Sequence, residues 1–166
     1  VLDLGSADGI LFDRLGICGP GSMGIDPTLP ADIRTRQGFL LVRGYFPQDL
    51  PAGAGPFDAI VMLAVLEHFP ESGYTALAAG CARLLKPGGR LVISVPSPAV
   101  DAILDVLIKV RLVHGMSLEE HHGYEVHRTP EIFPEPEFAL IARETFQLGL
   151  NNLFVFERRP STGTAL

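Results

Sequence analysis

The sequence has 166 residues, 47% of them hydrophobic, and a formal net charge of −6 at pH 7, which suits one globular domain. Its 13 basic residues form no run, so the charge pattern gives no support for nucleic acid as a partner. We expect no signal peptide, and the sequence contains no run of about 20 apolar residues. The two cysteines, at positions 18 and 81, make no metal or disulfide spacing, and we expect reduced thiols in a cytoplasmic protein.

Apolar segments alternate with helical stretches along the chain, a pattern typical of an α/β fold with a mainly parallel sheet. The pattern predicts strands over 1–4, 21–26, 39–43, 57–63 and 90–95. It predicts helices over 8–15, 70–85 and 98–113, and a helical turn around 31–36. Two further strands, 138–145 and 148–157, are separated by a tight turn and predict an antiparallel hairpin.

A loop of small residues follows the first predicted strand, where positions 1–9 read VLDLGSADG. Such a loop lets a ligand approach the backbone closely, and free amide groups at the start of a helix favour a carboxylate or phosphate. The dinucleotide pattern places glycines at the first, third and sixth loop positions. Here the third is Ala7 and the sixth is Ile10, which argues against NAD or FAD. A plain structural turn is the alternative.

An aspartate, Asp26, lies where the second predicted strand ends, and Pro27 follows it. We expect its carboxylate to face the edge of the sheet that carries the small-residue loop. An ionised carboxylate accepts two hydrogen bonds and can therefore hold a ribose diol. A solvated turn aspartate before proline is the alternative interpretation.

Four segments resemble the motifs of class I S-adenosylmethionine-dependent methyltransferases, in that family's order. Residues 1–9 resemble its first motif, an acidic strand end followed by G-x-G-x-G, with Ala7 at the middle glycine. The second segment is the strand end at Asp26. Residues 57–68, FDAIVMLAVLEH, resemble its fourth-strand motif, and 84–93, LLKPGGRLVI, resemble its turn into the fifth strand. Residues 146–157 also resemble the closing strand of a bacterial branch of the family.

The resemblance implies a Rossmann-like α/β fold, a three-layer sandwich with a seven-stranded, mostly parallel sheet. One antiparallel strand would come from the C-terminal hairpin. We expect the domain to span 1–158 and a flexible tail to cover 159–166. Because the chain opens within a predicted core strand, we expect the complete domain to have an N-terminal helix that this sequence lacks.

The resemblance also implies that S-adenosylmethionine binds across the carboxyl ends of the first, second and fourth strands. The expected cofactor-binding residues are Asp3, Gly5, Ser6, Ala7, Gly9, Asp26, Pro27, Tyr45, Phe46, Leu63, Ala64 and Val65. Tyr45 occupies a position where the family commonly has an acid. We therefore expect main-chain contacts and stacking by Tyr45 and Phe46 to hold the adenine.

Histidines cluster between the fifth predicted strand and the C-terminal hairpin, at His114, His121, His122 and His127. Their spacing matches no helical H-E-x-x-H pattern, and we expect no metal. One interpretation is a polar loop; the other is an active-site lid in which His122 accepts a proton from the methyl acceptor. His68 is a second candidate base, and its alternative role is packing at the start of a helix.

The sequence thus predicts methyl transfer from S-adenosylmethionine to a small-molecule acceptor, without nucleic acid as a partner. The apolar helix over 98–113 is interpreted either as a pocket wall or as the face of a homodimer. Two alternatives stay open. One is a non-catalytic module that binds S-adenosylmethionine or a protein, and the other is a nicotinamide-dependent oxidoreductase.

Overall fold

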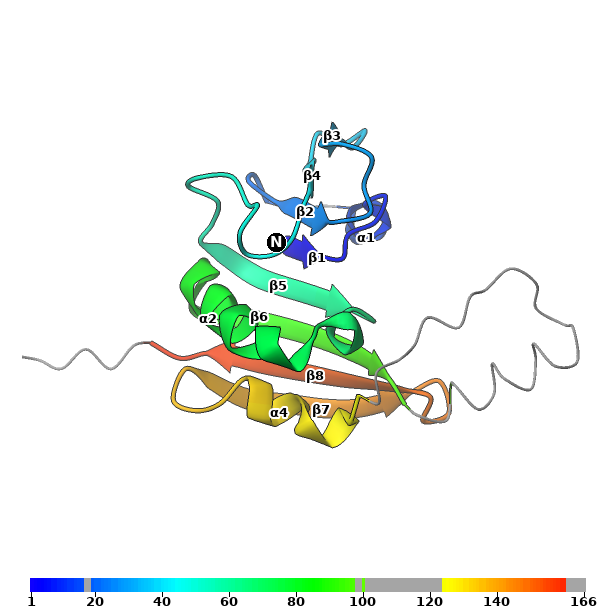
Figure 1. The fold of residues 1–166 in the computed structure, drawn as a ribbon, viewed down its shortest axis with the longest axis vertical. Coiled ribbons are helices and arrows are strands. Elements are labelled where there is room, and N and C mark those ends of the chain that lie inside the picture. Colours follow the sequence, from blue (N-terminus) through cyan, green and yellow to red (C-terminus); the bar gives the residue numbers. More distant parts are fainter. Residues whose placement is uncertain (17–18, 98–99, 101–123, 161–166) are drawn as a thin grey trace, which may run out of the picture.

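The computed structural model describes residues 1–16, 19–97, 100 and 124–160 (Figure 1). The predicted helix over 98–113 lies outside the described residues, except for position 100. His114, His121 and His122 lie outside them as well. The prediction that His122 acts as a base is therefore not addressed by the structure.

One sheet of eight strands, in the order β3-β4-β2-β1-β5-β6-β8-β7, forms the centre of the described part of the molecule. The strands are β1 (Leu2–Leu4), β2 (Met23–Asp26), β3 (Ile33–Arg34), β4 (Leu40–Arg43), β5 (Phe57–Leu63), β6 (Leu85–Pro96), β7 (Phe138–Phe146) and β8 (Asn151–Arg158). Neighbours from β4 through β6 are parallel, whereas β8 is antiparallel to both β6 and β7. The seven predicted strands and the single antiparallel one in the hairpin are therefore confirmed.

The eighth strand, β3, is a two-residue edge strand that pairs antiparallel with β4. The predicted helical turn around 31–36 is wrong. The Oδ1 atom of Asp32 accepts a hydrogen bond from the backbone N–H of Arg43 at 2.8 Å, and the N–H of Thr35 donates to the carbonyl of Phe39 at 2.9 Å. These contacts hold the segment extended along β4.

Helices cover both faces of the sheet. They are α1 (Ile10–Leu15), α2 (Tyr74–Leu84) and α4 (Thr129–Ile132), with short 3-10 turns η1 (Leu66–His68), η2 (Glu71–Gly73) and η3 (Val126–Arg128). Consecutive strand residues point to opposite faces of a sheet. Leu41 packs with Phe12 of α1, whereas Val42 belongs to the large core cluster that includes Leu77 of α2. In Figure 1, α2 and α4 lie on the same side of the sheet.

The order of strands along the chain reverses at β1, because β2 and β4 lie on one side of it and β5 and β6 on the other. In open α/β sheets, such a switch point leaves a crevice at the carboxyl ends of the strands, where ligands bind. The small-residue loop, Asp26 and the segment after β5 all begin at this edge. Within the described residues, no helix is long and apolar enough to cross a membrane.

Candidate cofactor site

Asp26 connects the end of β2 to the small-residue loop after β1. Its Oδ2 accepts a hydrogen bond from the backbone N–H of Ala7 at 2.8 Å. Its Oδ1 accepts two more from Thr28, one from the N–H at 2.8 Å and one from the hydroxyl at 2.6 Å. Burial by itself would raise the pKa of Asp26, but these hydrogen bonds outweigh it, and the pKa is lowered. The carboxylate is therefore ionised and fixed in position at the switch point.

Asp3 is a second acidic group at this edge, and its side chain is buried at 4% exposure. Burial, and then repulsion from the charge of Asp26, raises the pKa of Asp3 to about 7. Near neutral pH, the Asp3 carboxyl is therefore divided between its charged and neutral forms. A positive charge placed beside it would favour the charged form.

The loop between β1 and α1 has left-handed backbone conformations at Gly5, Ala7 and Gly9, with φ of 73°, 42° and 83°. A side chain at Gly5 would also place its Cβ 2.4 Å from Cγ2 of Val65, so the loop touches the segment that follows β5. Ala7 adopts a conformation that favours glycine, and its hydrogen bond to Asp26 stabilises it. Ala7 is exposed, so its methyl group does not fill the loop.

The side chain of Ser6 faces the sheet. It is buried, and a Cβ added to Gly24 of β2 would lie 2.4 Å from the Ser6 hydroxyl. Among the described residues, this hydroxyl has no hydrogen-bond partner. A ligand in the crevice would therefore meet the backbone of Ser6 rather than its side chain.

A largely apolar cavity of about 190 Å³, which we call the cofactor cavity, opens beside the loop. It brings together five of the predicted cofactor-binding residues, namely Gly5, Pro27, Tyr45, Phe46 and Val65. Sites for whole drug-sized ligands typically measure about 300–1,000 Å³. The cofactor cavity therefore suits one part of a ligand, such as a heteroaromatic ring.

The two aromatic residues predicted to hold adenine have different surroundings. Tyr45 is 70% exposed at the rim of the cofactor cavity. Phe46 is buried in the main core cluster, and a Cβ added to Gly80 of α2 would lie 2.8 Å from its ring. Phe46 is thus mainly a core residue with one side toward the cavity.

Two residues that the sequence reasoning missed hold the loops of this site. Asp49 accepts a hydrogen bond from the backbone N–H of Tyr45 at 2.8 Å, so an acid does lie beside this loop, four residues after the expected position. Ser94 accepts hydrogen bonds from the N–H of Ala64 at its carbonyl (2.9 Å) and its hydroxyl (3.2 Å). Ala64 has a φ of 53° at the end of β5, and both it and Leu63 are exposed.

Two of the predicted histidines lie among the described residues. His68 is exposed and lines the cofactor cavity. His127 lies on η3 with its side chain 70% exposed, and its Nε2 is 3.5 Å from a carboxylate oxygen of Glu125. The described residues contain no group of three or more histidine, cysteine or acidic side chains that could hold a metal ion.

The switch-point crevice, with an ionised carboxylate at the end of the second strand, defines a Rossmann-like cofactor-binding domain. The sequence matches the model of a family described as "Methyltransferase domain" over residues 1–144, and the chain belongs to this family of class I S-adenosylmethionine-dependent methyltransferases.

Two curated relatives are named "Ubiquinone biosynthesis O-methyltransferase". The protein from Xylella fastidiosa (strain M23) is 32% identical over 133 residues, which cover 75% of this chain and 53% of the relative. The protein from Xanthomonas axonopodis pv. citri (strain 306) is 38% identical over 132 residues, which cover 75% and 54%. The chain therefore spans about half the length of these relatives.

A solved structure supports the fold independently of sequence. The N-methyltransferase NodS from Bradyrhizobium japonicum WM9, in complex with S-adenosyl-L-homocysteine, superposes with a TM-score of 0.61 at 17% identity. The match covers 96% of this chain and 77% of NodS. At this identity, the likeness shows a shared Rossmann-like fold.

Proposed function

We propose that this chain binds S-adenosylmethionine in the crevice at the carboxyl ends of β1, β2 and β5, and that the protein transfers its methyl group to a small-molecule acceptor. The observation that carries the proposal is the Asp26 carboxylate, ionised and hydrogen-bonded to the loop at the switch point. The relatives named as O-methyltransferases of ubiquinone biosynthesis support a small-molecule acceptor. NodS in its S-adenosyl-L-homocysteine complex supports the choice of cofactor.

The described residues fit the sugar of this cofactor. An ionised carboxylate offers about four lone-pair positions, and Asp26 uses three of them for Ala7 and Thr28. The remaining position suits one ribose hydroxyl. A rotation of the Thr28 hydroxyl away from Asp26 frees a second position for the other hydroxyl of the diol.

The remaining parts of the cofactor have complementary surroundings as well. The apolar cofactor cavity suits adenine, with Pro27 and Val65 on its walls and Tyr45 at its rim. Asp3 is a buried carboxyl with a pKa near neutrality, so the ammonium group of a bound amino acid would ionise it. The exposed amides of the loop over 5–9, together with Leu63 and Ala64, would hold the rest of the methionine part.

In this proposal, the protein mainly aligns the reactants. The sulfonium of S-adenosylmethionine supplies an electrophilic methyl group, so no catalytic triad is required. His68 lines the cofactor cavity and is the described candidate to accept a proton from an acceptor. His122 stays a candidate from the sequence.

We also propose that the protein is located in the cytoplasm. The net charge of −6 supports a small molecule over nucleic acid as the acceptor. A homodimer remains part of the hypothesis for the apolar segment over 98–113. The domain over 1–158, with a tail from 159, stays a proposal too.

Isothermal titration of S-adenosylhomocysteine into the wild-type chain and an Asp26→Ala variant tests the proposal. We expect the variant to bind about 5- to 150-fold more weakly, because a buried polar partner is lost. Asp58→Ala is the matched control, since Asp58 lies at the opposite end of β5 and its side chain is 79% exposed. Unchanged affinity in Asp26→Ala would refute the assignment, and release of S-adenosylhomocysteine during turnover would separate an enzyme from a non-catalytic module.

A further inference from the structure

A second cavity, of about 300 Å³, lies between the turns η1 and η2 on one side and η3 on the other. Three carboxylates, one guanidinium and two phenols line it, from Glu67, Glu71, Glu125, Arg128, Tyr74 and Tyr124. The turn η3 lies more than 50 residues after η1 and η2 in the sequence, and the ion pair between Glu71 and Arg128 joins positions separated by 57. The cavity is thus a product of the fold rather than of a local motif.

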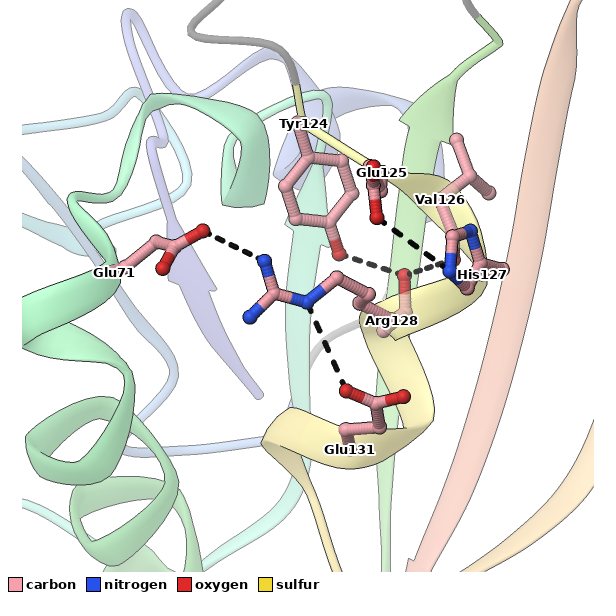
Figure 2. Close-up of polar contacts among 8 residues, drawn as sticks. Glu71, Tyr124, Glu125, Val126, His127, Arg128 and Glu131 are labelled. Atoms are coloured by element: carbon pink, nitrogen blue, oxygen red, sulfur yellow. Dashed lines mark hydrogen bonds and ion pairs between the residues drawn. The ribbon is translucent and has the colours of Figure 1, made fainter.

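The single guanidinium of this second cavity is already matched by carboxylates. Figure 2 shows Arg128 between Glu71 and Glu131. Its Nη1 lies 2.7 Å from a carboxylate oxygen of Glu71, and its Nε lies 3.7 Å from one of Glu131. Its positive charge is therefore offset before any ligand binds. Of the other two lining carboxylates, Glu67 is buried at 5% exposure and Glu125 lies 3.5 Å from the imidazole of His127. Among the described residues that line the cavity, three carry a carboxylate and one carries a guanidinium.

The hydroxyl of Tyr124 is oriented so that it can only accept a hydrogen bond from a ligand. The Thr129 hydroxyl donates its one proton to the carbonyl of Val126 at 2.8 Å. In the 2.7 Å contact between Tyr124 and Thr129, the phenol must therefore be the donor. Burial raises the pKa of Tyr124 to about 12, so the phenol keeps its proton near neutral pH. A ligand that reached this oxygen from the cavity would then meet only its lone pairs.

From this lining, we propose that the second cavity binds an organic cation, a protonated amine carried on a small aromatic or apolar group. The ammonium protons would be donated to the Tyr124 oxygen and to the carboxylate of Glu125. The rings of Tyr74 and Phe69, which also line the cavity, favour a cation over their faces.

The second cavity adjoins the proposed methyl-donor site. Phe69 and Pro70 line both this cavity and the cofactor cavity, so an occupant of one lies next to an occupant of the other. The amine would accordingly belong to the methyl acceptor; this last step rests on the proposed function, whereas cation binding itself does not.

Calorimetric titration of the chain with three probes of similar shape tests the cation site, without S-adenosylmethionine present. Benzylamine, which is protonated at pH 7, should bind measurably, and benzyl alcohol should bind about 10-fold more weakly because it lacks the charge. Benzoate should show no binding. Equal binding of benzyl alcohol or benzoate, or no binding of benzylamine, would overturn the proposal.

Two variants test whether benzylamine binds in this cavity. Tyr124→Phe keeps the ring and removes the accepting oxygen, and Glu125→Gln keeps the shape and removes one charge. Each should weaken benzylamine binding by about 10-fold. Glu137→Gln removes an exposed carboxylate that does not line the cavity, so it should leave binding unchanged. If the control weakens binding as much as the two variants do, the site is not in this cavity.

Binding of S-adenosylhomocysteine separates failure of this inference from failure of the proposed function. Tyr124→Phe and Glu125→Gln should bind S-adenosylhomocysteine like the wild type, which also shows that both variants are folded. Benzylamine binding without S-adenosylhomocysteine binding would refute the proposed function and leave the cation site standing. The reverse result would refute the cation site alone.

Discussion

Replacement of Asp3 by asparagine should change how the stability of the protein depends on pH. The pKa of this buried carboxyl rises from 3.8 to about 7 on folding, so the folded protein keeps the Asp3 proton to higher pH than the unfolded chain does. The contribution of Asp3 to stability is therefore complete below about pH 4 and is lost as the pH rises to about 7. The rise in pKa corresponds to about 4 kcal/mol in the free energy of unfolding.

Urea unfolding of the wild type and Asp3→Asn at several pH values from 4 to 8 measures this effect. Asparagine does not titrate, so the variant should gain stability relative to the wild type by up to about 4 kcal/mol between pH 4 and pH 8. The relevant quantity is how the difference in the free energy of unfolding between the two proteins changes with pH. The buried amide adds the same contribution to this difference at every pH. Asp58→Asn, at an exposed position, is the control and should show no comparable gain. If the difference in the free energy of unfolding between Asp3→Asn and the wild type stays constant from pH 4 to pH 8, the reasoning is refuted.

Two further predictions concern the loop and its aspartate. Gly5→Ala should lower the free energy of unfolding by about 2 kcal/mol, because it combines a left-handed backbone with a Cβ that overlaps Val65. A double-mutant cycle with Val65→Ala, measured by urea unfolding, should show favourable coupling, and additive effects would contradict the contact. Thr28→Val removes the hydroxyl that donates to Asp26 at 2.6 Å, so the pKa of Asp26 should rise. A carboxyl-carbon NMR titration measures this pKa, and an unchanged value would show that the hydroxyl does not stabilise the charge.

Much of the fold could be predicted because the core strands are short apolar runs bounded by turn residues. The strand Phe57–Leu63 was predicted with the bounds that the structure has. The edge strand Ile33–Arg34 was missed because its two residues are exposed and carry no apolar pattern. Its extended form depends on hydrogen bonds to residues that lie later in the chain.

The candidate site was predictable where it follows from the ends of strands. Asp26 and the loop over 5–9 meet because parallel strands bring their carboxyl ends to the same edge. The buried state of Phe46 was not predictable, because an apolar ring after a strand suits the core and a cavity equally. The second cavity was invisible in the sequence, since Glu71 and Arg128 meet only through the packing of η2 against η3.

A crystal structure of the chain with S-adenosylhomocysteine tests the central claim most directly. The ribose hydroxyls should lie about 3 Å from the carboxylate oxygens of Asp26. The adenine should occupy the cofactor cavity between Pro27 and Val65. Density for S-adenosylhomocysteine elsewhere would contradict the account. So would its absence from this edge of the sheet in a crystal grown with saturating S-adenosylhomocysteine.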